Sequence, residues 1–235
     1  NFFKNQADCY IEFENPLALS KYFNHRSFTI SFWATLGSTD KTEPFVSIRK
    51  RGGGTKSWLH IQYEIPDPEA TPPRPGGTMC FAFYNNDVRA NFNAETNKFY
   101  HIACTFDKTV DGGTMKIFID GQLIGTEINR SPLQFDGTFE HAYIGRYSFS
   151  GPDKKYTGKL GDFKIYNYPL HEINPCPPVT SLSNVQNLPR ARYVWIGKDQ
   201  VPEDHTWRNN INLQGVQIFD NNLVNVARDS IRGGK

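Results

Sequence analysis

The sequence lacks several features that would place it in a common functional class. It has no apolar run long enough to span a bilayer and no signal peptide. Its formal net charge is only +2 at pH 7, so neither a nucleic-acid nor a membrane partner is expected. Its four cysteines do not form a CxxC metal pair, and HxH, HExxH and GxSxG patterns are missing. These absences argue against a metalloprotease and a serine hydrolase.

Helix-forming sequence is scarce as well. The 235 residues include only two Met, and runs rich in Ala, Leu, Glu and Lys are missing. The apolar material is aromatic instead, with 18 Phe and 11 Tyr, while 19 Gly and 15 Pro allow many turns. This composition predicts an all-β protein. Because the chain starts at Asn1 rather than Met, we expect it to be a processed product or an excised piece.

The clearest β pattern lies between Phe99 and Gly125. Ile102, Cys104 and Phe106 alternate with more polar residues, as in a strand with one buried face. A second alternating run follows and ends at Asp120-Gly121, a dipeptide that favours a two-residue hairpin turn. The pattern predicts an antiparallel meander, which needs a second sheet to cover its apolar face.

Alternation predicts further strands on both sides of this meander. They cover residues 8–13, 28–36, 45–49, 58–65, 78–84, 87–93, 139–147 and 158–167. Residues 66–77 contain five of the 15 Pro and are expected to form a loop, as are residues 148–155. About a dozen short strands without a convincing helix indicate an antiparallel sandwich.

Several of these segments together resemble the laminin-G-like branch of the concanavalin A-like lectin/glucanase superfamily. The matching segments are Phe28–Trp33, Phe99–Asp107, Phe118–Gln122, Ile144–Gly145 and Gly158–Tyr166, followed by Leu170 and Glu172. Their order and spacing extend over residues 8–173. The resemblance implies an antiparallel jelly-roll β-sandwich over residues 1–175, with two curved sheets and a concave face that often holds sugar.

The remaining sequence divides into a linker and a short extension. Residues 176–189 have a Pro/Ser-rich linker composition. Residues 190–235 contain two predicted strands, 191–196 and 211–219, and resemble the start of a discoidin-like galactose-binding module. Such a short segment must pack on the main domain or continue into a longer module. The pairing of the two domains is similar to surface proteins of large algal DNA viruses, and equally fits a bacterial surface protein. It implies an extracellular or virion-surface location.

The four cysteines leave the disulfide state open. Cys9 lies in the first predicted strand and Cys176 just after the last one, so a bridge between them would close the main domain. Cys104 is on the apolar face of its strand, where a buried free thiol is the expected state. Cys80 lies in another predicted strand, and its state is open.

The predicted strand 58–65 contains the best candidate binding residues. Trp58, His60 and Gln62 share one face, while the neighbouring aliphatic and tyrosine residues make the better core face. An aromatic ring stacks on the C–H side of a sugar ring, and His and Gln can hydrogen-bond its hydroxyls. Arg146 and Tyr147 are expected to join them from another strand. The alternative is that Trp58 points into the core and His60 is merely exposed.

The same residues suggest an alternative function as a polysaccharide lyase. His60 would act as the base and Gln62 would hydrogen-bond a uronate carboxylate, with Arg146 and Tyr147 assisting. The order His-Ile-Gln differs from the Gln-x-His pattern of jelly-roll lyases.

A glucanase-type hydrolase is the weaker enzymatic alternative. Glu64, Asp67 and Glu69 lack the glucanase spacing, and Pro66 and Pro68 interrupt the strand, so these acids are expected to lie in a solvated loop.

Calcium is the one cofactor that the resemblance suggests. Asp162 occupies the place of a metal-binding Asp in the glucanase branch, and Asp107 is a second candidate. The function expected overall is non-catalytic recognition of a polysaccharide or glycan at a cell or virus-particle surface. The alternatives are a cell-wall polysaccharide-degrading enzyme, a lyase more than a hydrolase, and a structural particle component that binds other surface proteins.

Overall fold

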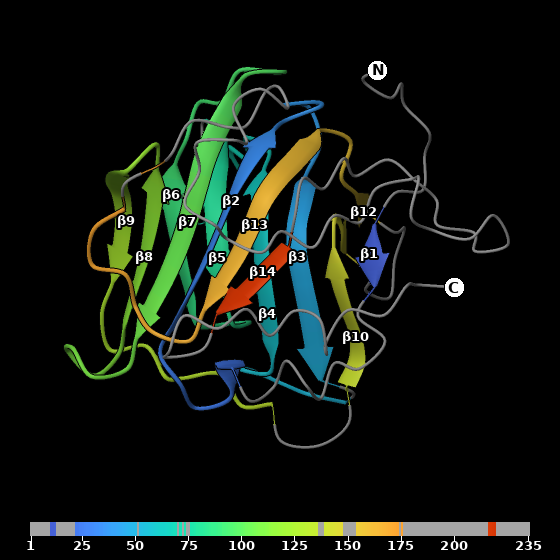
Figure 1. Cartoon of the computed structure of the whole chain (residues 1–235). Helices are drawn as coiled ribbons and strands as arrows, with labels where there is room; N and C mark the ends of the chain where they lie inside the picture. Colours follow the sequence, from blue (N-terminus) through green and yellow to red (C-terminus); the bar gives the residue numbers. More distant parts are fainter. Residues whose placement is uncertain are drawn as a thin grey trace, which may run out of the picture.

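The computed structural model describes most of the expected main domain and one segment of the extension. The described residues are 10–12, 22–50, 52–69, 71, 73, 76–135, 139–147, 154–173, 175 and 216–219. They form two six-stranded sheets packed face to face, with the sheet of β7, β2 and β13 in front of the sheet of β3, β4 and β5 in Figure 1. This confirms the predicted all-β jelly-roll sandwich. Tyr22 and Phe23 lie in a helical turn.

The first sheet is antiparallel throughout. In spatial order its strands are β1 (Ile11–Glu12), β10 (Phe139–Ile144), β3 (Glu43–Lys50), β4 (Trp58–Glu64), β5 (Thr78–Ala82) and β6 (Asp87–Asn91). The β5–β6 hairpin turns at residues 83–86, so β5 ends two residues before the predicted strand 78–84 does. We call the side of this sheet that faces away from the sandwich interior its outer face.

The second sheet contains the meander. In spatial order its strands are β14 (Val216–Phe219), β13 (Lys159–Tyr166), β2 (Phe28–Thr35), β7 (Phe99–Asp107), β8 (Thr114–Ile119) and β9 (Gln122–Glu127). The β14–β13 pair is parallel and the other pairs are antiparallel. Strand β14 falls inside the predicted strand 211–219, and residues 191–196, the linker and the rest of the extension lie outside the described residues.

Residues with positive φ form the turn or bend between consecutive strands at two places. Asp120 and Gly121 have φ values of 51° and 82°, which is the two-residue hairpin geometry expected for this dipeptide. Gly145, at φ 82°, separates β10 from β11 (Arg146–Tyr147). Strand β11 pairs with β12 (Lys154–Lys155), a two-residue strand in a segment that the sequence predicts as loop. Such a short strand leaves no alternation for the sequence to show.

Phenylalanine rings fill the space between the sheets. Phe28, Phe32 and Phe106 of the second sheet are fully buried, and so are Phe45 and Phe81 of the first. Phe28 meets Phe81 edge to face with ring centroids 6.1 Å apart. Since burial of one such ring stabilises the fold by about 1.5–3 kcal/mol, this aromatic layer is a major source of stability.

A segment after β13 covers part of the outer side of the second sheet. Leu170 and Ile173 pack on Ala103 and Phe118. The Thr29 hydroxyl accepts a hydrogen bond of 2.8 Å from the backbone N–H of Leu170, which holds the segment against β2. This sheet therefore has an apolar cover on both sides along part of β7 and β8.

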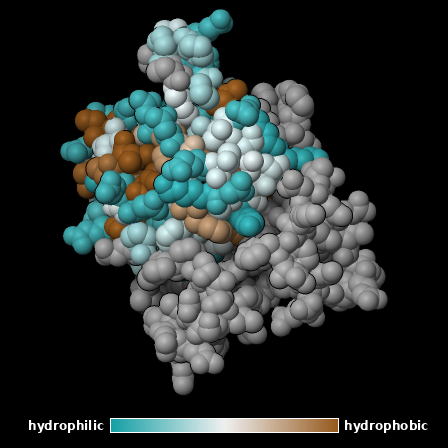
Figure 2. Space-filling model, turned by 90° about the horizontal axis from the view of Figure 1, so that it is seen from above, coloured by the Kyte–Doolittle hydropathy of each residue, from teal (hydrophilic) through white to brown (hydrophobic). Residues whose placement is uncertain are grey.

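Cys80 and Cys104 are buried free thiols, as predicted for Cys104. Cys9 and Cys176 lie outside the described residues. The described part of the chain contains no helix with the length and apolar character needed to cross a membrane. Figure 2 views the molecule from above, and its hydrophobic surface gathers on the left, the side on which β8 and β9 lie in Figure 1. Leu123 of β9 is 51% exposed.

Candidate functional site

Strand β4 has the two faces that its alternation predicts. Leu59, Ile61 and Tyr63 belong to the main core between the sheets. Trp58, His60 and Gln62 stand on the outer face, but they are only 4%, 5% and 7% exposed. Trp58 therefore does not enter the core and His60 is not simply exposed. Neighbouring side chains must enclose both of them.

Trp58 lies in a cluster of rings contributed by three segments. Its ring centroid is 4.9 Å from that of Tyr147 and 5.5 Å from that of Tyr84. We call Trp58, Tyr84 and Tyr147 the aromatic cluster. Tyr84, in the β5–β6 turn, is 38% exposed and gives the cluster its contact with solvent. The contact with Tyr147 agrees with the expectation that this residue joins Trp58.

Polar neighbours fix the orientation of the Trp58 ring. Its indole N–H donates a hydrogen bond of 3.1 Å to the Ser47 hydroxyl, which is also hydrogen-bonded to His141 at 3.0 Å. The Arg49 guanidinium lies 5.1 Å from the centroid of the Trp58 ring, and Arg49 is the cross-strand partner of Trp58. Arg49 and Tyr84 were not predicted as site residues, because the sequence does not give strand register or the path of a turn.

Arg146 precedes Tyr147 in β11, but its side chain contacts other residues. Its guanidinium is 4.5 Å from the Tyr10 ring centroid and 5.2 Å from that of Tyr143, next to β1 and β10. Tyr143 stacks on His141 with centroids 4.8 Å apart. The contacts of Arg146 are thus with a second group of rings, whereas Tyr147 contacts Trp58.

The electrostatics of His60 and Tyr147 favour their neutral forms. Burial lowers the pKa of His60 from 6.5 to about 4, although Asp87 and Glu64 act in the opposite direction. Burial also raises the pKa of Tyr147 from 10.0 to about 12. His60 Nδ1 is buried without a hydrogen-bond partner in the described residues. Both side chains are neutral near pH 7.

Gln62 begins a chain of polar contacts that crosses to β6. Its amide N–H donates a hydrogen bond of 2.8 Å to Glu64, and Glu64 accepts another of 3.1 Å from Arg89. Arg89 also donates to Asp87 at 2.9 Å. Cys80 separates Gln62 from Arg89 in the sheet register, and burial raises the pKa of its thiol well above its usual value. Arg89 was not predicted as a site residue, because its contact with Glu64 depends on the register of β4, β5 and β6.

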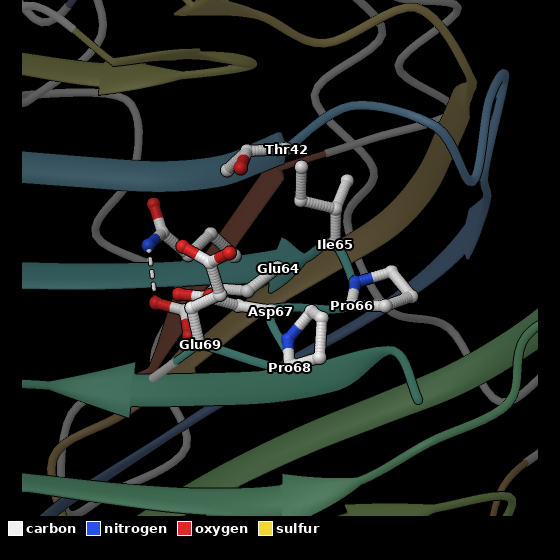
Figure 3. Close-up of a pocket in the computed structure, with 8 residues that line it drawn as sticks. Thr42, Glu64, Ile65, Pro66, Asp67, Pro68 and Glu69 are labelled. Atoms are coloured by element: carbon white, nitrogen blue, oxygen red, sulfur yellow. Dashed lines mark hydrogen bonds between the residues drawn. The ribbon is translucent and has the colours of Figure 1, made fainter. Parts of the chain in front are cut away.

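A pocket of about 540 Å³ lies next to Gln62, at the end of β4. Its lining includes Glu64, Asp67 and Glu69, and Figure 3 shows their carboxylates gathered on one side. Asp67 is partly buried, while Glu69 is exposed. The three acids predicted to lie in a solvated loop are thus brought together around one pocket.

The two residues predicted for calcium make other contacts. Asp107 accepts hydrogen bonds from the backbone N–H and the hydroxyl of Thr109, and its pKa is lowered by these bonds although burial alone would raise it. Asp162 forms an ion pair of 2.5 Å with Lys164. Among the described residues, no group of three His, Cys, Asp or Glu side chains is arranged to hold a metal ion. The described geometry therefore gives the calcium prediction no support.

The second sheet carries a Trp–His pair of its own. Trp33 of β2 and His101 of β7 are cross-strand partners with ring centroids 5.3 Å apart. Burial lowers the pKa of His101 to about 4, and Lys164 acts in the same direction. His101 was not predicted as a site residue, because its neighbour Trp33 is remote along the chain.

The fold is that of a known family. A laminin-G family model described as the concanavalin A-like lectin/glucanases superfamily matches residues 5–173. No curated protein sequence matches significantly.

Three solved structures illustrate the similarity. A candidate carbohydrate-binding protein from Bacteroides ovatus is 18% identical, with a TM-score of 0.49 over 68% of this chain and 42% of that protein. A pentraxin from Limulus polyphemus is 13% identical, with a TM-score of 0.49 over 72% of this chain and 74% of its own. The CBM40 module of a Ruminococcus gnavus sialidase, bound to α2,3-sialyllactose, is 13% identical, with a TM-score of 0.49 over 72% of this chain and 91% of the module. This chain thus spans less than half of the Bacteroides ovatus protein.

Proposed function

Since the chain belongs to the concanavalin A-like lectin/glucanases superfamily, we propose that it recognises a polysaccharide or glycan without cleaving it. The observation that carries this proposal is the aromatic cluster on the outer face of β4, formed by Trp58, Tyr84 and Tyr147. Aromatic faces beside fixed polar groups are the combination that sugar binding requires.

The parts of the cluster have different roles in this proposal. Tyr84 is the accessible ring that a sugar would meet first. Trp58 lies behind it and is held by its hydrogen bond to Ser47, so the ring loses little further freedom on binding. Because Trp58 and His60 are almost fully buried, a sugar ring reaches them only if neighbouring side chains move. Tyr84 is the ring of the aromatic cluster that is open to solvent.

The titration behaviour of the site supports binding rather than lyase chemistry. A general base works best when its pKa lies near the working pH. The pKa of His60 is about 4, which makes it a weak base, and the pKa of Tyr147 is about 12, which makes it a weak acid. Arg146 contacts Tyr10 and Tyr143, two rings outside the aromatic cluster.

The proposed place of action is a cell or virus-particle surface. This part of the proposal rests on the resemblance of the order of segments, residues 1–175 followed by 190–235, to surface proteins. A structural particle component that binds protein is the competing outcome of the experiment below.

The test is retention of the protein on a panel of insoluble cell-wall polysaccharides, with the supernatant monitored for ultraviolet-absorbing unsaturated products. We expect retention on at least one polysaccharide without such products. Trp58→Ala should strongly weaken retention, and Tyr84→Ala, which changes an exposed ring, should weaken it less in a folded protein. Trp58→Phe is the matched control that keeps an aromatic face.

Three results would overturn the proposal. Release of unsaturated products that depends on His60 would identify a lyase. Equal retention of the wild-type protein, Trp58→Ala and Tyr84→Ala would place binding elsewhere, and retention on no polysaccharide would favour a structural role.

A further inference from the structure

The pocket at the end of β4 carries charge of one sign. Three of its lining residues are acids, Glu64, Asp67 and Glu69, and no Lys, Arg or His is among the described residues that line it. Arg89 contacts Glu64 at 3.1 Å, and Asp67 and Glu69 are the other two acids of the lining. Its volume of about 540 Å³ falls in the range of small-ligand sites.

Gln62 points to a ligand that donates hydrogen bonds. The side chain lines the pocket and is 7% exposed. Its amide N–H donates to Glu64 at 2.8 Å, which fixes the orientation of the amide group. The remaining oxygen, Oε1, is buried and has no hydrogen-bond partner in the described residues. A buried acceptor without a donor is unfavourable, so a bound donor would stabilise this arrangement.

We infer that this pocket binds the protonated amine of an amino sugar, so that the preferred polysaccharide contains glucosamine-type residues with free amino groups. The inference rests on the proposed function, since it names the class of sugar that the β4 face recognises. An ammonium group supplies three donors and a positive charge. These match the Gln62 oxygen and the carboxylates of Asp67 and Glu69.

Other ligand classes fit the pocket less well. A uronate, sialate or sulfate group would meet three carboxylates and find no basic side chain among the described lining residues. A metal ion would need several ligands around one point, and the described residues contain no group of three His, Cys, Asp or Glu that could hold one. A neutral hydroxyl could satisfy Gln62 but would not use the charge of Asp67 and Glu69.

The pocket lies on the same strand as Trp58 of the aromatic cluster. Gln62 follows Trp58 by four residues on the same face of β4, which corresponds to about 13 Å along a strand. A polysaccharide that lies along β4 from the aromatic cluster would therefore bring a later sugar ring to the pocket. Figure 3 shows Ile65 and Pro66 opposite the carboxylates, and their apolar side chains can contact the C–H side of that ring.

The experiment is isothermal titration calorimetry of the protein with two oligosaccharides of equal length at slightly acidic pH. One is a β-1,4-linked glucosamine oligomer, and the other is its fully N-acetylated form. We expect the free-amine oligomer to bind about tenfold more tightly, or more, since charge-assisted hydrogen bonds are formed only with it. The double variant Asp67→Asn/Glu69→Gln should lose this preference, and added salt should reduce it.

Matched controls separate this inference from the proposed function. Glu95→Gln, whose side chain is 71% exposed and which lies outside the pocket, should keep the full preference. Equal affinity of the wild-type protein for both oligomers, or binding to neither, overturns the inference. If another polysaccharide is still bound and Trp58→Ala strongly weakens that binding, the proposed function survives this failure. A preference for the free-amine oligomer that is insensitive to the double variant also overturns the inference.

Discussion

The two sheets each carry a Trp–His pair on the side away from the core. Trp58 and His60 lie two residues apart on β4, with ring centroids 5.1 Å apart. Trp33 and His101 face each other across β2 and β7, at 5.3 Å. Both histidines have a pKa of about 4 for the same main reason, burial, and both have an Nδ1 without a hydrogen-bond partner in the described residues.

The surroundings of the two pairs differ. Tyr84 and Tyr147 extend the Trp58 ring into a cluster that reaches solvent. Both histidines have charged neighbours: Asp87, Glu64 and Arg89 at His60, and Lys164, Asp162 and Asp120 at His101. A Trp beside a His is therefore not in itself a binding site. The additional rings around Trp58 distinguish the candidate site from its counterpart.

The largest effect that we expect is shared by both pairs and concerns acid stability. Each native histidine has a pKa of about 4, below the ordinary 6.5, so the unfolded state binds more protons between these values. Stability is then full above pH 6.5 and falls as the pH drops toward 4. The difference corresponds to roughly 3 kcal/mol for each histidine.

Urea unfolding at pH 7 and pH 4.5 measures this loss. His60→Gln and His101→Gln should each reduce the difference between the two pH values. If the two variants at buried positions keep the full pH dependence, the histidines are not the cause of it.

The second expected effect, on polysaccharide affinity, distinguishes the Trp58–His60 pair from the Trp33–His101 pair. Trp58→Ala should weaken binding of the recognised polysaccharide by about 2 kcal/mol, or roughly thirtyfold, because a central aromatic anchor is lost. Trp33→Ala, on the other sheet, should change the affinity less than twofold. Calorimetry on variants that show native circular dichroism measures both. A comparable loss of affinity in Trp33→Ala would mean that the polysaccharide does not bind specifically to the Trp58 face of the first sheet.

How far the sequence predicts this site depends on how local each contact is. The alternation of β4 was enough to assign Leu59 and Ile61 to the core and Trp58 to the opposite face. The contact of Tyr147 with Trp58 was also expected. Arg49 was not predicted, because it reaches Trp58 through the register of β3 against β4, and alternation does not determine register.

The acidic pocket could be predicted from the sequence only in part, because it depends on the path of a loop. Pro66 and Pro68 correctly predict that β4 ends near residue 65 and that a loop follows. Spacing along a strand then ceases to apply to Asp67 and Glu69, whereas Glu64 is still the last residue of β4. Only the path of the loop determines that they line one pocket with Gln62, and that path depends on tertiary contacts.

The third effect is smaller and concerns the charges around each histidine. Lys164 lowers the pKa of His101, and Arg89 lowers that of His60. Lys164→Gln should therefore raise the pKa of His101 and leave His60 unchanged, whereas Arg89→Gln should do the reverse. Titration of the histidine ring protons by NMR measures both, with Lys116→Gln on β8 as a control. A shift of both histidines in either variant would show that the two faces are electrostatically linked.

The smallest expected effect is that of calcium removal. Asp162 lies beside the Trp33–His101 pair and was the first residue predicted to bind calcium, but its carboxylate pairs with Lys164 at 2.5 Å. A calcium ion would have to displace that ammonium and recruit six or more oxygen ligands. No group of three acids or histidines suited to a metal is found within the described residues. We therefore expect EDTA to leave both the Tm and polysaccharide binding unchanged. If EDTA lowers the Tm and Asp162→Asn removes that response, calcium does bind beside the second pair, and the two faces then differ by a metal site as well as by their rings.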